Sequence, residues 1–381
     1  VRVTDDHGAF VDQAVVITIN GTNDVPLITN TATELVGVVI ESGHEDDGTV
    51  VTGTPVATGQ LAATDVDADA TQTWSVHGAN SAVYGDFTVD AATGKWTYEL
   101  SNSSSLVTQS LKEGQVVSQS YTVRVTDDFG AYADQVVMIT IKGTNDAPQI
   151  EATSVASGVV SESGLSADGT AFSGITTAVG IVTAIDVDAN STQTWTVKSD
   201  NSITTYGDFA ISPATGKWTY TLDNSLAATQ ALNVGDSVTQ SYTVRVTDDF
   251  GAYDDQEITI TINGTNDAAI VTNAIVALTE TDIALSTSGT LTSIDVDNAD
   301  NTFTASTKVG TYGDFVIDAA GNWTFVANSA FNELNVGQSY SETFNVTSVD
   351  GTPSTVQVTI NGTNDAAIVD SAVIVLNETN A

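Results

Sequence analysis

The segment QSYTVRVTDDFGAY, residues Gln119–Tyr132, decides the fold. Apolar and polar residues alternate in it up to the acidic turn DDFG, and several of its residues are β-branched or aromatic. This period of two is typical of a β-strand with one buried face, because successive side chains of a strand point to opposite sides. We therefore expect Tyr121, Val123 and Val125 to face a core.

Internal repeats surround this segment. The same letters return from Gln240, and the motif YGDF begins at Tyr84, Tyr206 and Tyr312. The phrase GTND follows an apolar run four times, at Gly21, Gly143, Gly264 and Gly362, with spacings of 122, 121 and 98 residues. A fixed period of this kind indicates tandem copies of one domain.

Each copy contains roughly seven short strand patterns separated by turn signals, and none contains a convincing helical stripe. We predict an all-β chain of tandem antiparallel Ig-like β-sandwiches joined end to end. The expected boundaries are 1–24 for the end of a preceding copy, 25–146, 147–267 and a shorter 268–365 for three sandwiches, and 366–381 for the first strand of a following copy. The incomplete outer copies lead us to expect a longer array.

The third copy is shorter mainly between its early Glu280 and Asp295. This span is 15 residues, where the first two copies have 24. We expect the difference to fall in a loop or an extra hairpin and to leave the shared core intact.

Composition excludes several classes of protein. Nine Lys plus Arg against 48 Asp plus Glu give a formal charge of −39, which argues against nucleic acid as a partner. No apolar stretch is long enough for a membrane span, and no basic-then-apolar leader pattern is visible. A hydrophobic content of 41% suffices for packed cores, and without cysteine no disulfide contributes.

Four acidic signals recur in the copies: an early Glu, a D-V-D pair, an acidic turn and GTND. Two Asp at i and i+2 of a strand project in the same direction and can bind one ion. Clustered carboxylates repel by about 4 kcal/mol per pair at about 4 Å and an effective dielectric of about 20, and a divalent cation reverses this. Oxygen ligands without nearby His or Cys favour Ca²⁺ over Zn²⁺ or Mg²⁺.

A simpler explanation exists for single acids, because Asp and Asn suit turns and carboxylates keep strand edges soluble. Recurrence of the same four signals favours the metal. The stretch DVDADATQTWSV begins like an EF-hand loop, but Ala70 and Val76 stand where that loop requires Gly and Glu. We therefore exclude a helix-loop-helix site.

The motifs GTNDAP, TGKWTY, YGDF and ATDVDAD resemble those of VCBS repeats from giant bacterial surface proteins and RTX-type adhesins, and the layout resembles cadherin repeats. The resemblance covers nearly the whole chain. It implies extracellular, cadherin-like sandwiches with Ca²⁺ at the joints between them.

The resemblance also assigns ligands by position. The joint before the first full copy takes Asn23, Asp24, Asp65, Asp67, Asp127 and Asp128. The joint between the first and second copies takes Glu41, Asn145, Asp146, Asp186, Asp188, Asp248 and Asp249. The next takes Glu162, Asn266, Asp267, Asp295 and Asp297, and the last is represented by Glu280, Asn364 and Asp365.

Two departures from the family pattern concern the acidic turn of the third copy and the L-D-R-E type segment of cadherins. The turn DDFG becomes SVDG, so Ser348 and Val349 replace the acids and Asp350 stands one place later, which predicts a weaker or differently built site. The acidic cadherin segment reads LSNS, LDNS and VANS, where only Asp223 keeps a carboxylate. We expect fewer ions per joint than cadherins hold.

Other chemistries fit less well. The only histidines are His7, His44 and His77, and no Gly-x-Ser-x-Gly motif occurs, which argues against an enzyme. Recurring aromatic positions raise a carbohydrate-binding sandwich as a rival, but they are in phase with the inward residues and favour core packing. These positions are Trp74, Trp195 and Phe303, then Trp96, Trp218 and Trp323.

We therefore predict a structural extender or stalk of a secreted bacterial surface adhesin or extracellular filament, with joints that Ca²⁺ makes rigid. The alternative is a carbohydrate- or protein-binding module with its ligand site on one copy. Expected partners are the neighbouring repeats, other copies of the chain in a filament or matrix, and surface glycans or proteins.

Overall fold

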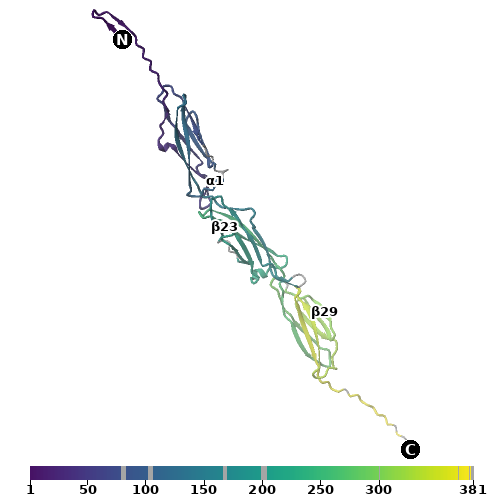
Figure 1. The fold of residues 1–381 in the computed structure, drawn as a ribbon. Helices are drawn as coiled ribbons and strands as arrows, with labels where there is room; N and C mark the ends of the chain where they lie inside the picture. Colours follow the sequence, from purple (N-terminus) through teal and green to yellow (C-terminus); the bar gives the residue numbers. More distant parts are fainter. Residues whose placement is uncertain are drawn as a thin grey trace. The chain divides into compact units, whose positions relative to one another are not determined.

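The computed structural model describes residues 1–78, 83–101, 106–165, 170–198, 204–299, 301–367, 369–376 and 378. Its regular secondary structure is almost entirely β-strand, which confirms the predicted fold class (Figure 1). The chain separates into two compact units. One comprises Val1–Ala152, Thr183–Trp195 and Arg245–Asp255, and the other comprises Thr153–Val182, Thr196–Val244 and Gln256–Ala381.

The first sandwich packs a four-stranded sheet against a three-stranded one. The four-stranded sheet has the order β4 (Val36–Ile40), β13 (Tyr132–Lys142), β12 (Val116–Asp127) and β9 (Gln72–His77). The other sheet has the order β10 (Gly85–Val89), β11 (Lys95–Leu100) and β7 (Val56–Gln60). Small pairs are β3 (Leu27–Ile28) with β8 (Ala63–Thr64), β5 (Gly43–His44) with β6 (Val50–Val51), and, near the N-terminus, β1 (Arg2–Thr4) with β2 (Phe10–Asp12).

The second copy repeats this topology. Its larger sheet has the order β15 (Ser157–Ser161), β24 (Tyr253–Asn263), β23 (Ser237–Thr247) and β20 (Thr194–Val197). Its smaller sheet has the order β18 (Thr177–Ile181), β22 (Lys217–Leu222) and β21 (Gly207–Ile211). The small pairs are β14 (Gln149–Ile150) with β19 (Ala184–Ile185) and β16 (Gly164–Leu165) with β17 (Ala171–Phe172).

The third copy distributes its strands differently. Here β26 (Ala274–Thr279), β33 (Pro353–Asn361) and β32 (Ser339–Thr347) form a three-stranded sheet. The four-stranded sheet has the order β27 (Ser286–Thr290), β31 (Asn322–Ala327), β30 (Gly313–Ile317) and β29 (Ser306–Val309), and β25 (Ile270–Val271) pairs with β28 (Ser293–Ile294). One strand has therefore exchanged sheets relative to the first two copies.

The alternating pattern correctly predicts the core. Tyr121, Val123 and Val125 are at most 1% exposed, because every second side chain of β12 faces the opposite sheet. The recurring aromatic positions are also buried, which confirms core packing: Trp74, Trp96, Trp195, Trp218, Phe303 and Trp323. Stacked rings, such as Phe87 on Tyr121 at 4.5 Å between centroids, join the two sheets.

The length difference of the third copy is confirmed as an extra hairpin in the others. Hairpins β5–β6 and β16–β17 occupy the span after the early Glu in the first two copies. In the third copy, β26 leads to β27 without a hairpin among the described residues.

Two single-turn helices, α1 (Leu106–Gln109) and α2 (Ala227–Gln230), were not predicted from the sequence, because four residues are too few to show a helical period. A single 3₁₀ turn, η1 (Ala32–Leu35), precedes β4. No helix in the described part of the chain is long and apolar enough to cross a membrane.

We predict that Gly59→Ala destabilises the first sandwich by about 1–3 kcal/mol through overpacking. A Cβ at Gly59 would lie 2.4 Å from Cε2 of the Trp96 indole, which the core holds rigidly. Hydrogen exchange of β7 and β11 peptides in increasing urea measures the change. Gly21→Ala is the matched control, since a Cβ there meets no atom within 4 Å. Equal protection in both variants would contradict the packing assignment.

Candidate functional site

The predicted ligands of the joint between the first and second copies lie together in one compact unit. The linker residue Asn145 donates its side-chain amide to Oδ2 of Asp248, at 2.9 Å, and the backbone N–H of Asp146 donates to Oδ2 of Asp188, at 2.8 Å. The backbone N–H of Asp188 in turn donates to Oδ1 of Asp186, at 3.0 Å. The linker therefore donates hydrogen bonds to both the D-V-D pair and the acidic turn of the second sandwich.

Glu41 reaches the same cluster from the preceding sandwich. It follows β4 directly and is fully buried. Its Oε1 accepts a hydrogen bond from the Gln109 amide of α1, at 2.9 Å, and its Oε2 faces the backbone N–H of Thr144 at 3.4 Å. Burial raises the pKa of Glu41, and the negative charges of Asp146 and Asp188 raise it further, so carboxylates of the linker and of the second sandwich act on it electrostatically.

The neighbouring joints repeat the contact between the linker N–H and the D-V-D pair. The asparagine contact with the acidic turn recurs at the earlier joint, while Asn266 of the later joint donates to the carbonyl of Asp267. Before the first sandwich, Asn23 donates to Asp127 at 3.0 Å and the N–H of Asp24 to Asp67 at 2.7 Å, while Thr71 donates to Asp128. After the second, the N–H of Asp267 donates to Asp297 at 3.0 Å. The recurrence of one hydrogen-bond scheme shows that GTND and D-V-D recognise each other in each copy.

Burial and mutual repulsion raise the pKa of the central carboxyl groups. Burial is the largest cause, and neighbouring aspartates add to it. The pKa of Glu41 rises to about 8, that of Asp188 to about 7 and that of Asp146 to about 6. At the following joint the pKa of Glu162 and that of Asp295 rise to about 7 and that of Asp267 to about 6.

Several carboxylate oxygens in these clusters are buried without a hydrogen-bond partner. They are Asp65 Oδ2, Asp146 Oδ2, Asp188 Oδ1, Asp267 Oδ2, Asp297 Oδ1 and Glu280 Oε2. A buried carboxylate oxygen without a donor is costly, so natural proteins usually pair it or place it on a cation. The set is made of oxygen atoms only, and these residues fit a hard divalent ion such as Ca²⁺.

In the described part of the chain, no group of three or more His, Cys, Asp or Glu side chains is arranged as a metal centre. The Asp188 carboxylate instead accepts the backbone N–H of Asp146. Closer groups of three are not expected without a cation between them, since each pair repels.

Domain models of bacterial origin match most of the chain. A bacterial cadherin-like domain matches residues 145–264 and 266–362, and a bacterial Ig domain matches residues 37–140. The chain belongs to the bacterial cadherin-like domain family. No curated protein sequence matches it significantly.

Solved cadherin structures resemble this cadherin-like chain at low identity. Repeats EC1-4 of Drosophila N-cadherin are 18% identical, with a TM-score of 0.35, over 90% of this chain and 76% of theirs. Repeats EC22-24 of mouse cadherin-23 are 15% identical, with a TM-score of 0.41, over 90% of this chain and 99% of theirs. Similarity at this level carries no functional conclusion.

The third cadherin-like copy positions its acidic turn in an unexpected way. The hairpin β32–β33 has 9 paired rungs where β12–β13 has 11. Counted from the linker end, where Ser339 pairs with Asn361 as Val116 does with Lys142, Asp350 occupies the place of Asp127. Its Oδ2 accepts the backbone N–H of Ala269, at 2.9 Å. The one-place shift in sequence is therefore compensated by the shorter hairpin.

Asp223 contacts its own turn. Its carboxylate accepts hydrogen bonds from the N–H and hydroxyl of Ser225, which lower its pKa. The adjacent Asn224 lines a cavity that also contains Gln230 and Asp267. The carboxylate of Asp223 is therefore held in its own turn by Ser225.

Sequence reasoning missed the glutamines that hold the buried glutamates. Gln230 donates to Oε1 of Glu162 at 3.1 Å, as Gln109 does to Glu41. The repeated letters TQ before a leucine, in TQSL and TQAL, were the available signal. His44 was also missed: its Nδ1 accepts the N–H of Ala147 at 3.2 Å and lies 3.6 Å from Asp146.

We predict that Gln109→Leu destabilises the first sandwich by about 1–3 kcal/mol in chelator, because it leaves a buried carboxylate without its side-chain donor. Gln230→Leu should act equally on the second. Chemical denaturation followed by hydrogen exchange measures both. Gln135→Leu is the control, since Gln135 is half-buried and its amide donates to the neighbouring Val136 carbonyl, at 3.4 Å, instead of to a carboxylate. The assignment is wrong if all three variants match the parent chain.

Proposed function

We propose that the chain is a segment of a VCBS-type array in a secreted bacterial surface adhesin, where it acts as an extender that Ca²⁺ makes rigid. The observation that carries this proposal is the set of buried, partnerless carboxylate oxygens at successive joints. Cadherin-like and Ig-like domains of bacteria are usually extracellular, non-enzymatic structural modules, which agrees with this role.

The proposed boundaries follow the GTND phrases, at 24/25, 146/147, 267/268 and 365/366. At the joint after Asp146, the cation would be held by Glu41 from one sandwich, Asp146 from the linker, and Asp186, Asp188 and Asp248 from the next. The corresponding set one joint later is Glu162, Asp267, Asp295, Asp297 and Asp350. A bound divalent ion supplies positive charge that offsets the repulsion among these groups.

The protein's own residues prepare the linker for this task. Backbone N–H groups of the linker already donate to the D-V-D aspartates, so the chain direction is fixed before any ion binds. Direct contacts add to this: the N–H of Ala189 donates to the carbonyl of Ser110 at 3.2 Å, and Asn233 donates to the carbonyl of Asp297 at 3.0 Å. Carboxylates from both sides then converge on a linker with little freedom.

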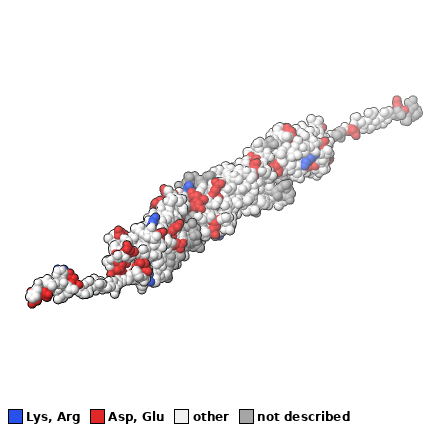
Figure 2. Space-filling view, turned by 90° about the horizontal axis from the view of Figure 1, so that it is seen from above, with Lys and Arg blue, Asp and Glu red and all other residues white. Residues whose placement is uncertain are grey.

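Calcium affinity of extracellular modules is typically about 10⁻⁴ to 10⁻³ M, so joints of this kind fill outside a cell and are largely empty in cytosol. This gives the proposal a direction, in which the chain stiffens after export. Acidic residues (red) outnumber basic residues (blue) on the face shown in Figure 2, so the surface is strongly negative. Lateral association into a filament would require cations to offset that charge.

We predict that Asp188→Asn and Asp297→Asn each remove calcium binding at one joint. Isothermal titration of the full chain should show one class of sites weakened at least about tenfold in either variant, since a charged ligand of a hard cation is lost. In chelator both variants should be as stable as the parent or more stable, because a repelling charge is gone. Asp90→Asn is the control: Asp90 is bound within its own turn by Thr93. Unchanged titrations of both joint variants would refute the proposed ligands.

A further inference from the structure

The third sandwich has an opening beside β32, where the first sandwich has a paired strand. In the first sandwich, β9 pairs with β12 along six rungs, from Gln72 opposite Asp127 to His77 opposite Thr122. In the third, the described residues of the corresponding strand meet β32 near the Phe303–Ser348 bridge, where the N–H of Thr304 donates to the Thr347 carbonyl. It then leaves and pairs with β30 as β29.

This departure exposes an edge of β32. The backbone carbonyl of Thr347 points away from β33, because it accepts the N–H of Thr304. Its partner on β33 is Pro353, which has no N–H to donate. The direction of the backbone N–H and C=O groups alternates from one residue to the next along a strand. Those of Asn345, two residues before Thr347, therefore also point away from β33. Its counterpart in the second sandwich, Thr243, receives the backbone N–H of Lys198 at 3.0 Å.

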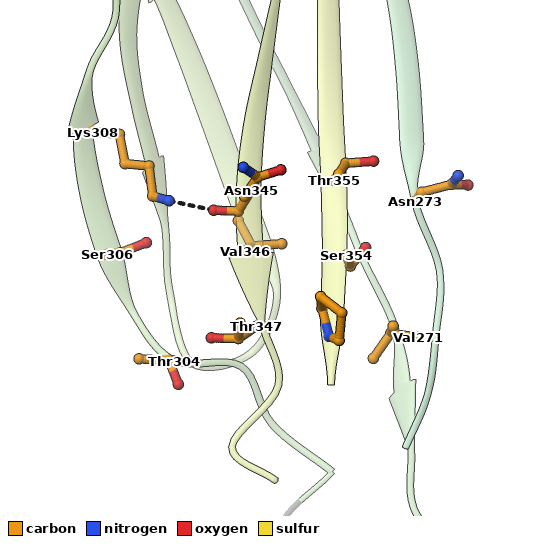
Figure 3. A pocket seen from close by; sticks show the side chains of 11 residues that line it. Val271, Asn273, Thr304, Ser306, Lys308, Asn345, Val346, Thr347, Ser354 and Thr355 are labelled. Carbon is orange, nitrogen blue, oxygen red and sulfur yellow. Dashed lines mark hydrogen bonds between the residues drawn. The ribbon is translucent and has the colours of Figure 1, made fainter. Parts of the chain in front are cut away.

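A lysine side chain takes the place of that lost backbone donor. The Lys308 ammonium, extending from β29, donates to the carbonyl of Asn345 across the opening (Figure 3). Lys308 is also the only Lys or Arg after Arg245 in the sequence. The one cation of this part of the chain therefore lies where a strand is missing.

An ion pair that covers this face in the other copies is absent from the third. Arg124 and Asp134 occupy one rung of β12–β13 and form a two-point ion pair at 2.7 and 2.8 Å, with the guanidinium over the Tyr132 ring. Arg245 and Asp255 do the same in the second sandwich. The matching rung of the third copy is Thr347 with Pro353.

The result is an open cavity of about 560 Å³, in which Val271, Val346 and Pro353 alternate with hydroxyl and amide side chains such as those of Ser306 and Asn345 (Figure 3). Its size falls in the range of about 300–1,000 Å³ typical of ligand sites. Unlike the joints, it contains no carboxylate among its lining residues. Glu342, farther along β32, is bound by the N–H groups of Thr311 and Tyr312.

We propose that this opening binds an extended peptide segment of another protein, added as a strand beside β32, with an acidic side chain of the peptide on Lys308. The N–H and C=O groups of a strand edge are satisfied best by another backbone, which is the basis of recognition by strand addition, and the Asn345 carbonyl is bound here by a side chain instead. Lys308 then exchanges the Asn345 carbonyl for the peptide carboxylate. The site does not depend on cation binding at the joints.

The test measures fluorescence anisotropy of two short, end-blocked peptides of alternating threonine and valine, one with a central glutamate and one with a central lysine. The full chain should bind the glutamate peptide at least about tenfold more tightly, in calcium and in chelator alike. Lys308→Glu should reverse the preference. A preference that does not reverse overturns the proposal.

A second variant, Thr347→Arg combined with Pro353→Asp, places in the opening the Arg–Asp pair of the first two sandwiches. It should weaken peptide binding at least about tenfold. Hydrogen exchange should show that the fold is retained. Failure of both peptides to bind the parent chain refutes the proposal. Binding of a neutral glycan that the double variant blocks, without peptide binding, would assign the opening to carbohydrate instead.

Discussion

The burial of several carboxylates within reach of one another is the constraint on which this structure depends. A β-sandwich on its own needs no buried charge, yet Glu41 and Glu162 are fully buried and their pKa values are raised. Backbone N–H groups of the linkers offset part of the cost, since Asp188 and Asp297 each accept one. Other carboxylate oxygens of the joints are buried without a donor, which is the basis of the proposal that a cation stabilises the joints.

The copies show how one scaffold separates two tasks. Core positions such as Trp96, Trp218 and Trp323 are equivalent and buried in all three sandwiches, and they fix the packing of the sheets. Joint residues also recur, so each copy offers the same acidic surface to its neighbour. Divergence is concentrated on the third sandwich, where a strand changes sheets and an Arg–Asp pair is lost. A repeat array can thus keep its joints while one member acquires a different surface.

Much of this organisation could be predicted from the sequence because it is local. A period of two places Tyr121 and Val123 in the core, and two aspartates at i and i+2 share a face whatever surrounds them. The Glu41–Gln109 contact could not be predicted in this way, since it joins residues 68 positions apart through a one-turn helix. The position of Asp350 depends on the length of the β32–β33 hairpin. The sheet to which β29 belongs depends on whether it pairs with β30 or with β32. These are tertiary choices that residue patterns leave open.

Small-angle X-ray scattering of the full chain, in millimolar calcium and after addition of excess chelator, tests the central claim most directly. We expect a narrow distribution of interatomic distances with calcium, and a broader one with a changed maximum dimension in chelator, because carboxylates that share no cation repel across each linker. Superimposable scattering curves in the two conditions would contradict the account.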